Sequence, residues 1–143
     1  HFKLYMTLMF DNRQTGITRK QLEMIAVTVS AVNKCSYCVA HHSVPLGMLP
    51  KNKILLKAIQ THDIEILEKT LSPEEYILIQ LAEKITRRPY DISEEDISIL
   101  EESGFNDKQI LHVVLVINYF NFANRNVLAL GVELESDYQK ACK

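Results

Sequence analysis

The sequence predicts an all-α protein, and three observations support this prediction. Apolar residues recur at helical spacing, as at Leu22, Ile25, Ala26 and Val29. Residues that commonly start helices precede several such segments, and glycine or proline follows them. No segment offers a partner for a β-strand. We therefore expect a single domain over residues 1–143, built from about seven helices.

The composition of the chain limits the kinds of protein that it can be. With 143 residues, 47% hydrophobic and 24% charged, the chain can bury a core of its own. A formal net charge of −2 and one adjacent basic pair, Arg87-Arg88, argue against nucleic-acid binding. No run of about 18 apolar residues and no signal-peptide pattern occur, so we expect a cytoplasmic protein without membrane contact. Of three cysteines, Cys142 is an incidental thiol and two form a C-x-x-C, which favours a reducing compartment.

The first helices are expected in the N-terminal third. Residues 2–10 are mostly apolar and compatible with a helix, and residues 11–16 suit a turn. Thr18, with Gln21 three residues later, has the pattern that starts the next helix. That helix is apolar on most faces, so we expect it to be buried. Its acidic residue Glu23 then requires a partner or must stay neutral.

A break is expected at Asn33-Lys34, because asparagine is common at helix caps and in turns. A new helix starting there places Cys35 and Cys38 in its first turn. Free amides and the helix dipole favour a thiolate at such a position. Residues that often interrupt helices follow, at Pro45, Gly47 and Pro50, although residues 44–49 can still include helical turns.

The remaining segments also predict helices. Residues 51–60 and 63–69 suit short ones. Ser72-Pro73-Glu74-Glu75 combines an N-cap, a first-turn proline and a capping-box glutamate, and the helix should run to about Arg88.

Two more helices are expected before the end of the chain. One starts at Ser93 with Asp96 three residues on, and ends at Gly104. The other runs from about Asn106 to Leu130. Its β-branched run at residues 113–117 could suit a strand, but the helical period continues through it.

The candidate site lies between Glu23 and His42. On a helix of about 100° per residue, Cys35, Cys38 and His42 fall within about 60° of one another. The two cysteines are one turn apart, where a disulfide is geometrically reasonable. Glu23 can join them only if the chain bends, because an unbroken helix would place it about 18 Å from Cys35.

The chain contains a pattern in which Glu23 is followed by eleven residues and then by C-x-x-C-x-x-x-H. This pattern resembles the signature of the AhpD-like alkylhydroperoxidases, within the carboxymuconolactone decarboxylase superfamily. The four residues match it position for position. The wider stretch from Met24 to His42, with Y-F-N-F-A-N-R at 119–125, most resembles the peroxidase-related branch. The prototype has a histidine between the cysteines, where this chain has Tyr37.

The resemblance implies an AhpD-like helical domain that assembles as a homotrimer or homohexamer, which the apolar excess of the helices also fits. It implies a peroxidase that reduces hydrogen peroxide or organic hydroperoxides through a Cys35/Cys38 dithiol–disulfide cycle. Cys38 is then the attacking thiol and Cys35 the more accessible resolving thiol, with a Glu23/His42 proton relay. No cofactor or metal is expected, and a thioredoxin-like or lipoylated protein is the expected reductant.

Three alternatives stay open. The same C-x-x-C could serve a protein thiol–disulfide oxidoreductase or a redox sensor. Cys35, Cys38, His41 and His42 could bind structural zinc, although adjacent histidines point about 100° apart on a helix. Decarboxylation of a muconolactone-like substrate is the superfamily's other activity, but those relatives lack the C-x-x-C pair.

Other polar residues have simpler interpretations. His112 is expected to be a satisfied core histidine, and His62 a solvated residue in a link. Asn118, Asn121 and Arg125 share one helix face, which is either a polar or subunit-contact face or a lining of the catalytic cavity.

Overall fold

The structure is a computed structural model that describes residues 1–11, 15–48 and 53–135. In these residues it contains eight α-helices, one short 3-10 helix and no strand. The elements are α1 (Phe2–Met9), α2 (Arg19–Val32), α3 (Ser36–Met48), α4 (Lys53–Thr61), α5 (Ile64–Thr70), α6 (Pro73–Arg87), η1 (Pro89–Asp91), α7 (Glu94–Glu102) and α8 (Asp107–Ala129). The all-α prediction is confirmed. The count is close to the expected seven or so, and residues 2–10, which the sequence marked as compatible with a helix, contain α1, which packs on α8.

Helix starts follow the local sequence closely. Capping boxes begin α2, α6 and α7 at Thr18, Ser72 and Ser93, as predicted. A fourth begins α8, where Asn106 and Gln109 each accept a hydrogen bond from the other's backbone N–H. Each box satisfies two backbone donors that the first helical turn leaves without a partner.

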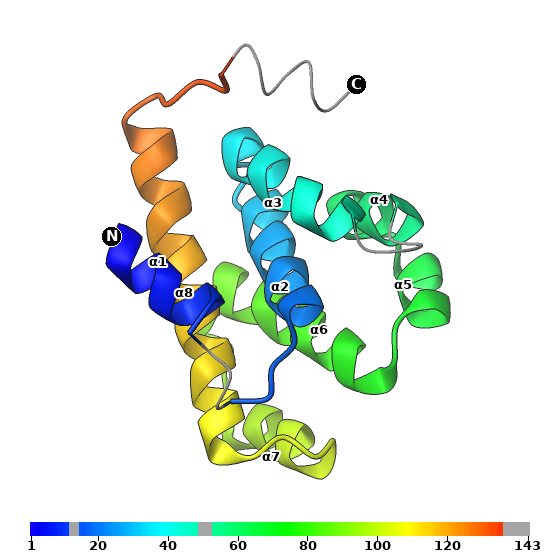
Figure 1. The fold of residues 1–143 in the computed structure, drawn as a ribbon. Coiled ribbons are helices and arrows are strands. Elements are labelled where there is room, and N and C mark those ends of the chain that lie inside the picture. Colours follow the sequence, from blue (N-terminus) through cyan, green and yellow to red (C-terminus); the bar gives the residue numbers. More distant parts are fainter. Residues whose placement is uncertain (12–14, 49–52, 136–143) are drawn as a thin grey trace.

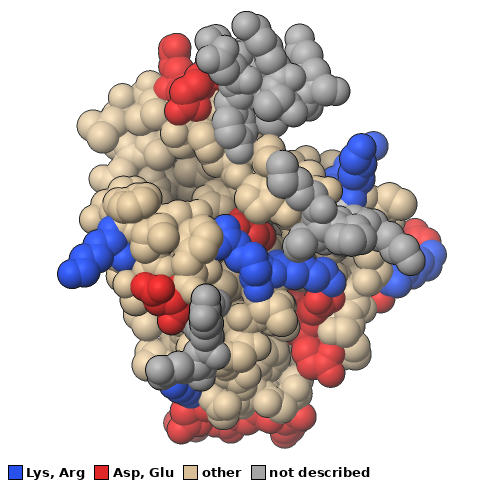
Figure 2. Space-filling model, viewed as in Figure 1, with Lys and Arg blue, Asp and Glu red and all other residues tan. Residues whose placement is uncertain are grey.

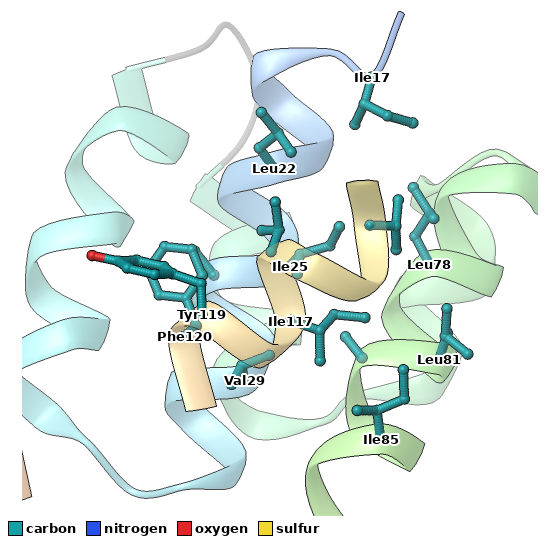
Figure 3. Packing of buried hydrophobic residues seen from close by; sticks show 14 of the residues in the cluster. Ile17, Leu22, Ile25, Val29, Leu78, Leu81, Ile85, Ile117, Tyr119 and Phe120 are labelled. Carbon is teal, nitrogen blue, oxygen red and sulfur yellow. The ribbon is translucent and has the colours of Figure 1, made fainter. Parts of the chain in front are cut away.

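Helix α2 lies at the centre of the molecule, with α3, α6 and α8 packed around it (Figure 1). Every residue from 22 to 30 is buried, as expected for a helix that is apolar on most faces. Leu22, Ile25 and Val29 pack against α6 and α8 in the larger core cluster (Figure 3). Met24 faces a second cluster shared with α4 and α5. The helix that carries Glu23 is therefore fixed from several sides.

Helix α8 continues through the β-branched run at residues 113–117, so the helical prediction is confirmed there. Val113, Val116 and Ile117 are buried in the larger core cluster. Gly131, with φ of 61°, follows the end of the helix. Long as α8 is, neither it nor any other described helix is both long and apolar enough to cross a membrane.

Helix α3 continues past Pro45 and Gly47 to Met48, so the helical turns that the sequence allowed for residues 44–49 are present as far as Met48. Pro45 cannot donate to the carbonyl of His41, which normally weakens a helix. Packing compensates, since α3 lies along α2 and its Leu46 is fully buried. Two other residues of the sequence analysis, Pro50 and Cys142, lie outside the described residues.

The chain breaks between α2 and α3 at Asn33-Lys34, as predicted. Asn33 ends α2, and Lys34 has the left-handed φ of 58°. The amide of Cys35 then donates to the carbonyl of Ser30 at 2.9 Å, which closes the turn. The carbonyl of Cys35 accepts from the amide of Val39, so Cys35 is the cap residue from which α3 starts. This turn lays α3 back along α2.

Candidate active site

Glu23 has no exposed surface and contacts two basic side chains. Its Oε2 lies 2.8 Å from Nδ1 of His42 on α3. Its Oε1 accepts from Nε of Arg19 at 2.7 Å and also pairs with Nη2 of the same guanidinium. A carboxylate removed from water requires partners of this kind. The structure thus joins Glu23 to His42, as the motif predicted, and adds Arg19.

Arg19 was not singled out from the sequence. Its guanidinium carbon lies 4.0 Å from the centre of the Phe10 ring, and its Nη1 donates to the carbonyl of Met9 at 3.3 Å. These contacts fix the cation against the end of α1. The signal that could have found it is its position four residues before Glu23, which places the two side chains on one face of α2.

The sulfurs of Cys35 and Cys38 lie 2.7 Å apart, and both cysteines are free thiols. Little movement is needed to reach the length of a disulfide bond. Cys35 is fully buried between α2 and α3, whereas Cys38 is 6% exposed. The expectation that Cys35 is the more accessible thiol is therefore wrong for this structure, because the turn that starts α3 encloses it.

Burial, together with the hydrogen bond and charge of Cys35, raises the pKa of the Cys38 thiol to about 12. The side chain of Asn124 and the amide of Cys38 act in the opposite direction but are outweighed. The thiolate expected at the helix start is therefore not favoured on Cys38. Cys38 needs a base to remove its proton when it reacts.

His42 is placed to be that base. It follows Cys38 by one helical turn, and both side chains line the same pocket. Because a carboxylate only accepts hydrogen bonds, Nδ1 of the neutral ring donates to Glu23 and Nε2 carries the lone pair. Phe120 packs edge-on against the ring, with 4.6 Å between centroids, and holds its orientation.

A pocket of about 410 Å³ opens beside Cys38 between α1, α3 and α8. Its described lining is aromatic or apolar apart from histidines, the thiol and tyrosine hydroxyls, and it includes no Asp, Glu, Lys or Arg. In Figure 2 the surface in this part of the molecule is mostly tan and hollowed. The lining residues used below are Tyr5, Tyr37, Cys38, His41, His42, Tyr119 and Phe120.

The asparagines of α8 hold the break between α2 and α3. The side-chain amide of Asn33 donates to the side chains of Asn121 and Asn124 at 3.0 Å each. Arg125 in turn donates to the backbone and side-chain oxygens of Asn121. None of Asn118, Asn121 and Arg125 lines the pocket, so the suggestion that they line the catalytic cavity is not supported.

His41 lines the same pocket, although we expected it to point to another face. Its ring lies 4.4 Å from that of Tyr37, and its Nε2 lies 3.2 Å from Oε2 of Glu135. Tyr37 donates to the other oxygen of Glu135 at 3.1 Å. These three residues form a rim that ties the segment after α8 to the start of α3.

His112 and His62 have partners of their own outside the pocket. His112 is buried, its Nε2 lies 3.0 Å from the carbonyl oxygen of Leu8, and burial lowers its pKa, as suits a satisfied core histidine. His62 is half exposed and pairs with Glu83 at 3.1 Å, outside the site. Within the described ranges, no three His, Cys, Asp or Glu side chains are grouped so as to hold a metal ion. The zinc alternative thus finds no ligand set there.

Several known proteins are similar to this chain in sequence and in fold. The profile of the carboxymuconolactone decarboxylase family matches residues 1–44, which include Glu23, both cysteines and His42. The uncharacterized protein YdfG of Bacillus subtilis strain 168 is 27% identical over 132 residues, which are 90% of this chain and 86% of that one. A crystal structure of a peroxidase-related protein from Silicibacter sp. TM1040 matches with a TM-score of 0.85 and 29% identity, over 96% of this chain and 69% of that one. These likenesses support the resemblance to the carboxymuconolactone decarboxylase superfamily that the motif indicates.

The fold is AhpD-like. A peroxidase-related protein from Ralstonia eutropha JMP134, described as an alkylhydroperoxidase AhpD core, superposes with a TM-score of 0.84 over 96% of this chain and 70% of that one. Its sequence identity is 24%, so this likeness concerns the fold. Together with the family match over residues 1–44, this fold supports the resemblance stated from the four-residue motif.

Proposed function

We propose that this protein is a thiol-dependent peroxidase that reduces hydrogen peroxide or organic hydroperoxides. One observation carries the proposal: a pair of thiols 2.7 Å apart lies beside a histidine whose Nδ1 is held by a fully buried glutamate. A dithiol, a base and an orienting acid are the groups that peroxide reduction by cysteine requires. The peroxidase-related proteins among the structural neighbours support the same class.

In the first step the sulfur of Cys38 attacks one oxygen of the peroxide. His42 takes the thiol proton on Nε2, a sulfur–oxygen bond forms, and the oxygen–oxygen bond breaks. The proton then passes to the leaving oxygen, which departs as water or an alcohol. Glu23 stabilises the imidazolium that exists between these transfers, and Arg19 holds the carboxylate. Cys38 is left as a sulfenic acid.

Cys38, rather than Cys35, is proposed as the attacking thiol because it lines the pocket, whereas Cys35 does not. Cys35 then attacks the sulfenic acid from 2.7 Å, which releases water and forms the Cys35–Cys38 disulfide. An external dithiol must return both sulfurs to thiols by exchange. A thioredoxin-like or lipoylated protein is the proposed reductant, and it must reach the disulfide through the pocket.

A peroxide-consumption assay tests this function. Reduced protein is mixed with hydrogen peroxide or with an alkyl hydroperoxide, and a small dithiol, a thioredoxin system or a dihydrolipoyl protein is supplied as donor. The proposal predicts catalytic turnover with at least one donor and none for Cys38→Ser. Turnover of a protein disulfide with no consumption of any peroxide would instead favour the thiol–disulfide oxidoreductase.

We also propose that the protein works as a homotrimer or homohexamer. Leu111, Leu115 and Phe122 follow one face of α8 and are each about half exposed, and exposed apolar stripes of this kind mark interfaces. Light scattering after gel filtration measures the assembly directly. A monomer at micromolar concentration would contradict this part of the proposal.

A further inference from the structure

Three tyrosine hydroxyls belong to the pocket, and their surroundings differ. The hydroxyl of Tyr5 faces the Arg19–Glu23 pair, and both charges act on it. The hydroxyl of Tyr37 donates to Glu135 at 3.1 Å, on the rim. Tyr119 is the third, and it belongs to the Y-F-N-F-A-N-R stretch, of which the proposed mechanism makes no use.

Tyr119 lies on the wall of the pocket formed by α8 and is 6% exposed. Its ring packs edge-on against Phe120 with 5.2 Å between centroids, and Phe120 packs in turn against His42. In Figure 3 its hydroxyl is directed away from the core side chains that surround the rest of the ring. That hydroxyl lies 3.3 Å from Nδ1 of His1, near the long limit of a hydrogen bond.

Tyr119 and Cys38 line the same pocket, Tyr119 from α8 and Cys38 from α3. Burial raises the pKa of Tyr119 to about 12, with smaller contributions in the same direction from Tyr5 and from the charge of Cys38. Tyr119 therefore keeps its proton at neutral pH. A neutral phenol in the pocket that holds the attacking sulfur is a hydrogen-bond donor, and a donor there stabilises the negative charge that develops on the leaving oxygen.

We propose that Tyr119 is a further catalytic residue, whose hydroxyl donates a hydrogen bond to the peroxide oxygen that leaves when Cys38 attacks. This inference rests on the proposed peroxidase function. As the sulfur–oxygen bond forms and the oxygen–oxygen bond breaks, the electron pair of the broken bond moves onto the leaving oxygen. Tyr119 stabilises that negative charge without giving up its proton, and His42 supplies the proton that completes the alcohol or water.

The test compares three reactions of Cys38 in fully reduced wild-type protein and in Tyr119→Phe. The first is oxidation by an alkyl hydroperoxide, which expels a strongly basic alkoxide. The second is oxidation by peracetic acid, which expels a carboxylate that needs little stabilisation. The third is alkylation by iodoacetamide, in which no oxygen leaves. Rates are followed by stopped-flow measurement and by mass spectrometry of Cys38.

Loss of one preorganised donor to a developing oxyanion costs on the order of 10²-fold in rate. We expect Tyr119→Phe to lose on that order with the alkyl hydroperoxide, and less than about threefold with peracetic acid or iodoacetamide. Tyr37→Phe removes a pocket hydroxyl already donated to Glu135 and should cost much less with the hydroperoxide. Tyr76→Phe, on α6 and outside the pocket, is the control for the substitution itself.

The outcomes separate this inference from the function on which it rests. Equal slowing of all three reactions in Tyr119→Phe would show an effect on the thiol or on the fold, and would overturn the assignment. Equal losses with the hydroperoxide in Tyr37→Phe and Tyr119→Phe would also overturn it. If peroxides oxidise the wild-type protein and Tyr119→Phe equally fast, the role of Tyr119 is refuted but the proposed peroxidase function is not. If no peroxide oxidises the wild-type protein, both the role of Tyr119 and the proposed peroxidase function are refuted.

Discussion

The pairing of Glu23 with His42 gives a quantitative prediction about catalysis. Glu23→Gln keeps the size of the side chain but removes its charge, in a place with no exposed surface. The 2.8 Å contact with His42 becomes a neutral hydrogen bond. A hydrogen bond to a charged group contributes about 1.5–3 kcal/mol, and about 1.4 kcal/mol corresponds to a tenfold change in rate. We therefore expect oxidation of Cys38 to slow by about 10- to 100-fold.

His42→Ala should lose more, because it removes the base itself, whose contribution is typically about 10²–10⁴-fold. Stopped-flow oxidation of Cys38 in the two single variants and the double variant forms a double-mutant cycle. Residues that act as one unit are strongly non-additive, so the double variant should be little slower than His42→Ala. If the rate loss of the double variant equals the product of the two single losses, the relay is refuted.

The chain provides a matched control for this cycle. His62 and Glu83 also form a histidine–glutamate pair, at 3.1 Å, and neither residue lines the pocket beside Cys38. His62→Ala and Glu83→Gln should leave the oxidation rate of Cys38 within about twofold, since exposed ion pairs contribute little. His41 lies on the pocket rim, so His41→Ala should slow the oxidation of Cys38 more than the control variants do and less than His42→Ala does.

Three further predictions concern stability, the roles of the cysteines and pH. Arg19→Gln leaves a fully buried carboxylate with only His42 as partner, and it should lower the free energy of unfolding by about 3 kcal/mol because breaking a buried ion pair is strongly destabilising. Glu23→Gln leaves a guanidinium that is about one third exposed, so it should lower the free energy of unfolding by less. Urea titration of both variants checks this order. Under limiting peroxide, Cys35→Ser should accumulate a sulfenic acid on Cys38 that a dimedone-type probe detects, and Cys38→Ser should remain unoxidised; a sulfenic acid on Cys35 would reverse the roles. Because burial and Cys35 raise the pKa of Cys38 to about 12, the folded state favours its neutral thiol, so the reduced protein should be stable below pH 9 and lose stability as the pH rises from 9 toward 12. Cys38→Ser should flatten that loss in thermal unfolding measured against pH, and an unchanged slope would contradict the assigned shift.

Local sequence signals predicted much of this fold because they act over a few residues. The caps at Thr18, Ser72 and Ser93 fix where helices begin, and the apolar faces of residues 22–30 predict that α2 is central. The break at Asn33-Lys34 was also visible in the sequence. From that break and the motif, the approach of Glu23 to His42 could be predicted.

Features that depend on distant parts of the chain could not be predicted in this way. The raised pKa of Cys38 and the burial of Cys35 arise only when α2, α3 and α8 pack together. Asn33 meets Asn124 across 91 residues, and no local pattern announces that contact. The position of His41 on the pocket likewise depends on the wall that α8 supplies, because helical periodicity gives a direction around α3 but not what lies there.

The most direct test of the central claim is the fate of both thiols after a single equivalent of peroxide. Fully reduced protein is treated with an alkyl hydroperoxide, quenched with an alkylating reagent under denaturing conditions, digested and examined by mass spectrometry. The account predicts that the peptide carrying Cys35 and Cys38 loses two mass units as an internal disulfide, with one peroxide consumed per disulfide formed. Recovery of both cysteines in alkylated form after that treatment would contradict it.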